Sequence, residues 1–177
     1  MNICVFCSQY DVAEKYKGAA ETLARLIAEH KYALVWGGAD EGLMGLIART
    51  AQRGRSRVIG VIQEKIKDKA YKNADEMIVV KNGRDMNLGL IERGDVIIVL
   101  VGGIGTLNEL TEIVRMKKDG EQNKPVVIVN TDHFYDGLKQ QLQRMNDEGF
   151  LRDDIMNSVH FVGTPEEAMH HLDSHGR

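Results

Sequence analysis

The chain has 177 residues, of which 43% are hydrophobic and 28% are charged, as is usual for one globular domain with its own core. Its formal net charge of −3 differs from the basic balance of duplex-binding proteins, so we expect no nucleic-acid partner. The sequence has no run of about 18 apolar residues and no signal-peptide pattern at its start, so we expect a soluble, cytoplasmic protein without membrane association.

Short runs rich in valine and isoleucine alternate along the chain with longer amphipathic stretches. The runs predict strands at Asn2–Cys7, Tyr32–Trp36, Arg57–Ile62, Glu76–Val80, Asp95–Val101, Pro125–Asn130 and Val159–Val162. The stretches predict helices at Val12–His30, Leu43–Arg53, Met86–Arg93, Thr106–Lys117 and His133–Glu148, and a short last helix capped by Thr164. This order predicts an α/β fold: a Rossmann-like open, mostly parallel sheet of about seven strands with helices on both faces, in a single domain spanning residues 1–177.

Three further features of the sequence bear on where a site could lie: a lysine-rich segment, the cysteines and the histidines. The segment Gln63–Asp75 is polar and rich in lysine, and it is either a solvated excursion or a lid over a site. The two cysteines, Cys4 and Cys7, fall inside the first predicted strand, where we interpret them as buried thiols rather than a redox or metal pair. The six histidines show no metal-ligand spacing, so we expect no metal site.

Two glycine-rich segments, Gly37–Gly45 and Gly102–Thr106, each join a predicted strand to a predicted helix. Glycine lets the backbone approach a ligand closely, and the free amides of a helix N-terminus favour an anion such as phosphate. The alternative is that the glycines only permit tight packing of strand against helix. Because two such turns occur in one sheet, we predict a phosphate or nucleotide site that includes Gly37, Gly38, Gly102, Gly103, Gly105, Thr106 and Ser8.

The second turn also carries a family signature. The residues Gly102-Gly103-Ile104-Gly105-Thr106-Leu107-Asn108-Glu109 resemble the P-G-G-x-G-T-x-x-E motif of the LOG family, whose members are often labelled lysine decarboxylases. Further ordered matches extend over nearly the whole chain, at Ile3–Cys7, Gly37-Gly38, Gly42–Gly45, Val58–Ile62, Lys124–Val126, Phe134-Tyr135 and Glu148–Leu151.

This resemblance implies a Rossmann-like homodimer that cleaves the N-glycosidic bond of a nucleoside 5′-monophosphate. The products would be a free base and ribose 5-phosphate, and the family's familiar substrates are AMP and cytokinin ribotides. The resemblance implies no metal or redox cofactor. The expected partner is therefore a small nucleotide, and a second copy of the chain.

Three positions depart from the family pattern. Val101 replaces the proline before Gly102, and Ala39 replaces a glycine and is followed by two carboxylates, Asp40 and Glu41. The family has an Arg-Lys pair at the start of the helix before the signature strand and uses that arginine in catalysis. The matching positions here are Met86 and Asn87.

Glu109 is the leading catalytic candidate, because a carboxylate can stabilise the ribosyl cation that forms as the glycosidic bond breaks. The alternative is a local role, since Thr106 and Glu109 also fit a capping box. Glu112 lies one helical turn further on, either at the same pocket or in solvent. Arg84 is the candidate to replace the missing arginine, although a surface charge is the simpler interpretation.

Met86 and Asn87 are candidate contacts to the base or ribose. Met86 would form a soft apolar wall, or simply belong to the core, and Asn87 would hydrogen-bond the ligand or cap its helix. Loss of the family arginine leaves a second hypothesis open. On that hypothesis the same fold holds a nucleotide-like ligand or cofactor without cleaving it, as a carrier or sensor.

Overall fold

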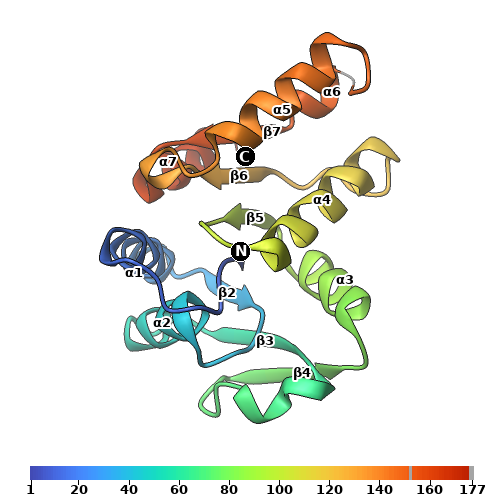
Figure 1. The fold of residues 1–177 in the computed structure, drawn as a ribbon. Coiled ribbons are helices and arrows are strands. Elements are labelled where there is room, and N and C mark those ends of the chain that lie inside the picture. The colour runs from blue at the N-terminus through green and yellow to red at the C-terminus, as the bar shows by residue number, and fades with distance from the viewer. Residues whose placement is uncertain (152, 176–177) are drawn as a thin grey trace.

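The computed structural model describes residues 1–151 and 153–175. Seven parallel strands form one sheet in the order β4-β3-β2-β1-β5-β6-β7 (Figure 1). The strands are β1 (Asn2–Phe6), β2 (Ala33–Trp36), β3 (Val58–Gln63), β4 (Glu76–Val80), β5 (Val96–Val99), β6 (Val126–Val129) and β7 (Val159–Val162). All seven predicted strands are present, and the predicted Rossmann-like α/β sheet is confirmed.

The core of the sheet is built from β-branched side chains. Strands β5 (VIIV) and β6 (VVIV) are buried at every position, because helices cover both faces of the sheet. The edge strand β4 is only partly buried.

Helices lie on both sides of the sheet because right-handed crossovers change face where the strand order reverses. Figure 1 shows α1 (Glu14–Glu29), α2 (Gly42–Arg53) and α7 (Pro165–His175) on one side, and α3 (Gly83–Arg93) and α4 (Ile104–Lys118) on the other. The remaining helices are α5 (Asp136–Asp147), α6 (Asp153–Met156) and the short 3₁₀ segments η1 (Glu64–Lys69) and η2 (Thr131–His133).

The strand order reverses between β1 and β5, which lie side by side with Phe6 opposite Val99. The backbone amide of Leu100 donates to the carbonyl of Phe6 at 2.9 Å, so the segments that follow β1 and β5 are still paired where they leave the sheet. In an open parallel sheet this switch point is where ligands bind, beyond the carboxyl ends of the strands.

Helices α3 and α4 begin two or three residues earlier than the sequence predicted, whereas α1 and α5 begin two or three residues later. Helix α3 starts at Gly83 instead of Met86, and the side chain of Asn82 caps it by accepting from the amide of Asp85 at 3.0 Å. Helix α4 starts at Ile104 instead of Thr106. The predicted cap of the last helix is confirmed, since Oγ1 of Thr164 accepts from the amide of Glu167 at 3.2 Å.

The lysine-rich segment after β3 is held against the rest of the fold. The amide of Asp40 donates to Lys69 O at 2.8 Å, and the amide of Tyr71 donates to Gly38 O at 2.9 Å. The Tyr71 ring also packs edge-on against the buried Trp36, with ring centroids 6.3 Å apart. These contacts favour a fixed wall over a lid.

Candidate nucleotide site at the sheet switch point

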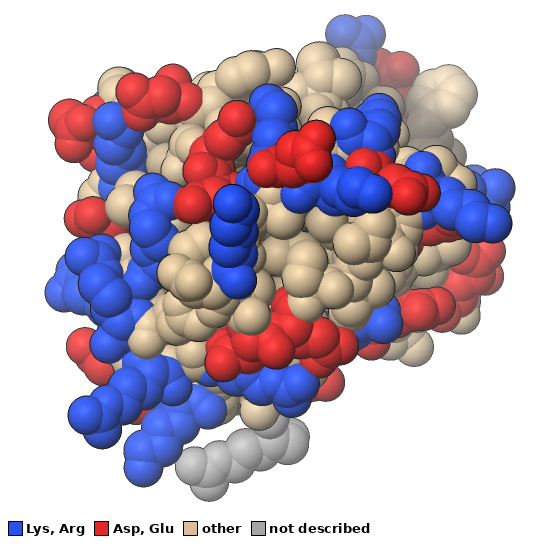
Figure 2. Space-filling view, turned by 90° about the horizontal axis from the view of Figure 1, so that it is seen from below, with Lys and Arg blue, Asp and Glu red and all other residues tan. Residues whose placement is uncertain are grey.

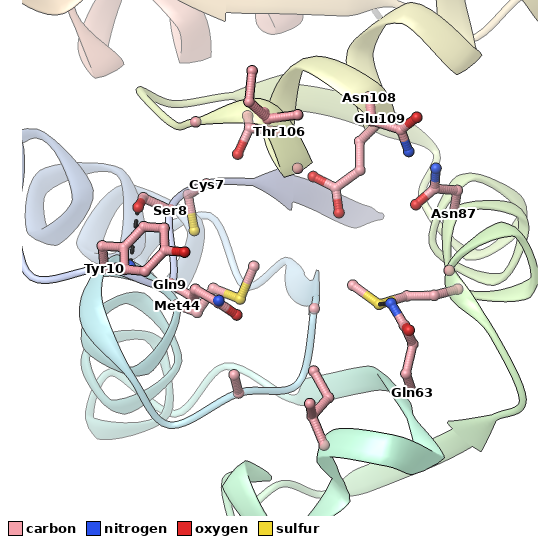
Figure 3. A pocket seen from close by; sticks show the side chains of 18 residues that line it. Cys7, Ser8, Gln9, Tyr10, Met44, Gln63, Asn87, Thr106, Asn108 and Glu109 are labelled. Atoms are coloured by element: carbon pink, nitrogen blue, oxygen red, sulfur yellow. Dashed lines mark hydrogen bonds between the residues drawn. The ribbon is translucent and has the colours of Figure 1, made fainter.

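A cavity of about 350 Å³ lies at the switch point (Figure 3). The residues that line it come from the turns after β1, β2 and β3 and from the first turns of α2, α3 and α4. The lining residues are Cys7, Ser8, Gln9, Tyr10, Gly37, Ala39, Met44, Gln63, Ile66, Gly83, Met86, Asn87, Gly103, Ile104, Gly105, Thr106, Asn108 and Glu109. Five segments of the sequence therefore meet here, at 7–10, 37–44, 63–66, 83–87 and 103–109, as the fold type requires.

The N-terminus of α4 opens into this cavity. Gly103 occupies the N-cap position without a side-chain cap, and its carbonyl accepts only from the amide of Leu107, at 3.0 Å. The amides of Ile104, Gly105 and Thr106 consequently have no acceptor within the helix. Such amides, together with the helix dipole, favour an anion.

Gly102 supports this turn without lining the cavity. A Cβ atom at Gly102 would lie 2.1 Å from Oγ1 of Thr106, so only glycine leaves room for that buried side chain. The hydroxyl of buried Tyr135 donates to the carbonyl of Leu100 at 2.9 Å and fixes the strand end just before the turn. Burial raises the pKa of the Tyr135 phenol, which keeps it a donor.

The first glycine-rich turn has a different role. The amide of Met44, in the first turn of α2, donates to the carbonyl of Ser8 at 3.2 Å. A backbone carbonyl of the protein therefore takes the place that an anion could take at this helix N-terminus. Gly42 has a φ of +51°, and a Cβ atom there would lie 2.3 Å from the carbonyl oxygen of Tyr10. Gly37 lines the cavity, whereas Gly38 packs against Ile62 outside it.

The two carboxylates in this first turn do not face the cavity. Asp40 pairs with Arg49, and Glu41 pairs with Lys69 at 3.0 Å. Neither residue lines the cavity, so their charges do not oppose an anion bound there.

Glu109 is the central side chain of the site. It is 5% exposed, and Figure 3 shows its carboxylate directed from α4 into the cavity. Its Oε2 atom has no hydrogen-bond partner among the described residues. Burial without a partner raises its pKa to about 8, because the charged form loses its hydration.

The capping-box interpretation of Glu109 is wrong. Thr106 is the third residue of α4, and Gly103 is the N-cap, so a Thr106–Glu109 box is out of register. The competing local role for Glu109 is thereby removed.

The structure places some of the other predicted site residues at the cavity and the rest away from it. Ser8, Met86 and Asn87 line the cavity, and Oγ of Ser8 accepts from the amide of Tyr10 at 3.0 Å. Asn87 is buried inside α3, so it does not cap that helix.

Arg84 and Glu112 do not line the cavity. Arg84 is exposed in the first turn of α3, and Glu112 pairs with Arg115 at 3.2 Å. Of the lining residues described, Glu109 is the one carboxylic acid, and none is arginine, lysine or histidine. Within 1–151 and 153–175, no group of three or more His, Cys, Asp or Glu residues is placed to hold a metal ion.

Sequence reasoning missed several lining residues: Tyr10, Met44, Gln63 and Asn108. Gln63 ends β3 and Tyr10 lies in the turn after β1, so position beyond a strand's carboxyl end was the available signal. Cys7 was expected to be buried and is, although it also lines the cavity floor; burial raises its thiol pKa.

The face seen from below, near β4 and η1, carries acidic and basic side chains interspersed, with basic ones more frequent along its left side (Figure 2). No helix in the described part of the chain combines the length and apolarity needed to cross a membrane.

Comparisons with known proteins place this geometry in context. Residues 44–172 match the model of a family described as "Possible lysine decarboxylase". The cytokinin riboside 5′-monophosphate phosphoribohydrolase of Rhodococcoides fascians is 35% identical over 154 residues, covering 85% of this chain and 78% of that protein. The probable cytokinin riboside 5′-monophosphate phosphoribohydrolase LOGL2 of Oryza sativa subsp. japonica is 30% identical over 176 residues, covering 98% of this chain and 72% of that protein.

Solved structures share the fold. The molybdenum cofactor binding protein of Rippkaea orientalis superposes with a TM-score of 0.73 at 24% identity, covering 98% of this chain and 94% of that one. The Moco carrier protein of Chlamydomonas reinhardtii superposes with a TM-score of 0.76 at 23% identity, covering 98% and 95%. The matching family model and the sequence relatives together show that the chain belongs to the LOG family.

Proposed function

We propose that this protein hydrolyses the N-glycosidic bond of a purine nucleoside 5′-monophosphate, AMP or an N6-modified, cytokinin-type nucleotide, to the free base and ribose 5-phosphate. The observation that carries the proposal is the buried, unpartnered carboxylate of Glu109, directed into a cavity beside the open N-terminus of α4. The relatives named above as phosphoribohydrolases support the reaction class.

The ligand would be oriented by its phosphate. The amides of Ile104, Gly105 and Thr106 would hold the phosphate oxygens, together with the hydroxyl of Thr106. The ribose would then extend along α4 towards Glu109, which lies one helical turn after Gly105. The base would lie on the far side of the cavity from the phosphate.

The reaction needs a group that stabilises positive charge at the sugar. As the bond from C1′ to the base nitrogen breaks, the ribosyl ring becomes cation-like, and the ionised carboxylate of Glu109 would stabilise it. Water would add its oxygen to C1′ and give one proton to Glu109, and Glu109 would pass a proton on to the departing base nitrogen. This transfer returns Glu109 to its ionised form, and the proposed reaction uses no metal or redox cofactor.

Release of free base tests this proposal. The protein is incubated with AMP and with N6-isopentenyl AMP, and the base is separated by chromatography. We expect base release that Glu109→Gln lowers by about a hundredfold to a thousandfold, the size of effect found when a main electrostatic group is removed. Equal release by the wild type and Glu109→Gln would exclude Glu109 as the catalytic carboxylate.

A second candidate function is binding without cleavage, as a carrier or sensor of a phosphorylated heterocyclic cofactor. The observation that favours it is the absence of arginine and lysine among the described lining residues, with Met86 at the position of the family's catalytic arginine. The cofactor-binding proteins that share the fold make this a concrete alternative. Thermal stabilisation by AMP without base release from any nucleotide would support it.

The decarboxylase wording of the family description finds no support in the cavity. Pyridoxal phosphate chemistry needs a lysine amine at the site, and none of the lining residues described is a lysine. We further propose a cytoplasmic homodimer, as the family resemblance implies. Light scattering on the eluted peak of a gel-filtration column would give a mass of one chain or two.

A further inference from the structure

Four of the uncharged side chains that line the cavity lie opposite Glu109 or beside it: Met44 of α2, Gln63 at the end of β3, and Met86 and Asn87 of α3. We call these four residues the neutral wall. Figure 3 shows Met44 and Gln63 across the cavity from the Glu109 carboxylate, with Asn87 closing the side next to Asn108.

Two thioethers form the apolar part of the neutral wall. A Cβ atom on Gly37 would lie 3.0 Å from Cε of Met44 and 3.2 Å from Cε of Met86, so the two methyl groups meet over the bare backbone of Gly37. Thioethers are polarisable and contact aromatic rings favourably. This part of the wall suits the face of a flat ring.

Two carboxamides form the polar part. Nε2 of Gln63 contacts Sδ of Met86 at 3.7 Å, which leaves its Oε1 free to accept. Asn87 is 6% exposed and lines the cavity. Its carboxamide is not needed to cap α3, because Asn82 does so, and it can therefore hydrogen-bond a ligand group in the cavity.

The combination of thioether and carboxamide selects a kind of ligand group. A carboxamide presents a donor and an acceptor side by side, which matches the edge of a nucleobase. The wall offers no cation for phosphate, and the open amides for an anion lie at α4 instead. The phosphate end of the ligand would therefore bind at the N-terminus of α4, and its other end would bind at the neutral wall.

We propose that the neutral wall is the subsite for the heterocyclic base, where Met44 and Met86 contact the ring face and Gln63 and Asn87 hydrogen-bond its edge. This inference rests on the proposed function for the presence of a base-bearing phosphate ester in the cavity. It adds that base selection uses an uncharged surface at the position where the family resemblance implies an Arg-Lys pair.

Comparing two ligands that differ only in the base tests the subsite. The dissociation constants of AMP and ribose 5-phosphate are measured by titration calorimetry in a Glu109→Gln background, so that AMP is not consumed. The variants are Gln63→Leu and Asn87→Leu, and the matched control is Gln140→Leu on the exposed side of α5. Circular dichroism confirms that each variant is folded.

We expect AMP to bind more tightly than ribose 5-phosphate. Each wall variant should weaken AMP binding about tenfold, the cost of one or two lost hydrogen bonds, and should leave ribose 5-phosphate binding unchanged within about twofold. The Gln140→Leu control should change neither ligand.

The failures are distinguishable. If AMP and ribose 5-phosphate bind equally well, or if the wall variants weaken both alike, the subsite is overturned while the phosphate site stands. If neither ligand binds the parent protein, the proposed function fails and the subsite fails with it.

Discussion

At the scale of single residues, the buried carboxyl group of Glu109 makes the stability of the fold depend on pH. Its pKa is about 8 in the folded chain against an ordinary 4.5, so between these values the folded state holds more protons than the unfolded state. Stability contributed by the protonated form is fully present below about pH 4.5 and is lost as pH rises to about 8. At pH 7 this loss is on the order of 3 kcal/mol.

Glu109→Gln should therefore stabilise the fold, because the neutral amide has nearly the same shape and never ionises. We expect its thermal midpoint to exceed that of the wild type at pH 7 to 8, with the difference shrinking towards about pH 4.5. Glu112→Gln is the matched control, since Glu112 is paired with Arg115 and should show no gain. Identical melting curves at pH 8 would show that Glu109 is not desolvated as described.

Met86→Arg tests the missing cation directly. An arginine at this buried lining position would place a positive charge in the cavity that contains Glu109, and an opposite charge lowers a carboxyl pKa. We expect the pH midpoint for base release to move below about 8 by one unit or more. An unchanged midpoint would mean that position 86 and Glu109 do not interact across the cavity.

At the scale of elements, the β5–α4 turn depends on one glycine far more than on its neighbours. Gly102→Ala would place a Cβ atom 2.1 Å from Oγ1 of Thr106, so the turn or the helix start must shift. Gly105→Ala is the matched control, because its Cβ atom would meet nothing within 4 Å and would lie in the first turns of a helix.

We expect Gly102→Ala to cost about 1–3 kcal/mol of unfolding free energy, the usual penalty for overpacking a buried position. Gly105→Ala should be neutral or add up to about 1 kcal/mol, since alanine favours helix over glycine. Urea unfolding of both variants gives the comparison. Equal losses in the two would contradict the close contact at Gly102.

The same elements show which local features the sequence reveals. Runs such as Val96–Val99 and Val126–Val129 predict buried strands because the apolar pattern is continuous. The predicted starts of α3 and α4 are two or three residues late, because Asn82 caps α3 with its side chain and α4 begins with no side-chain cap at all. The predicted starts of α1 and α5 are two or three residues early. Periodicity identifies the apolar face of a helix, whereas the first turn is set by local hydrogen bonds.

At the scale of the whole molecule, the switch point between β1 and β5 determines which residues form the site. The signature turn placed Glu109 at the cavity from sequence alone. The sequence prediction misses Gln63 and Tyr10, because a position at or beyond the carboxyl end of a strand does not tell which of these side chains turn toward the cavity. Arg84 is a candidate ligand contact in the sequence, but the structure has it exposed in the first turn of α3 and outside the cavity lining.

The pH dependence of AMP cleavage is the most direct test of the central claim, that a desolvated Glu109 acts as a carboxylate on a nucleotide held by α4. The rate of adenine release at low AMP concentration should rise about tenfold per pH unit below a midpoint near 8 and level off above it. A rate that falls across this range, or no adenine at any pH, would contradict the account.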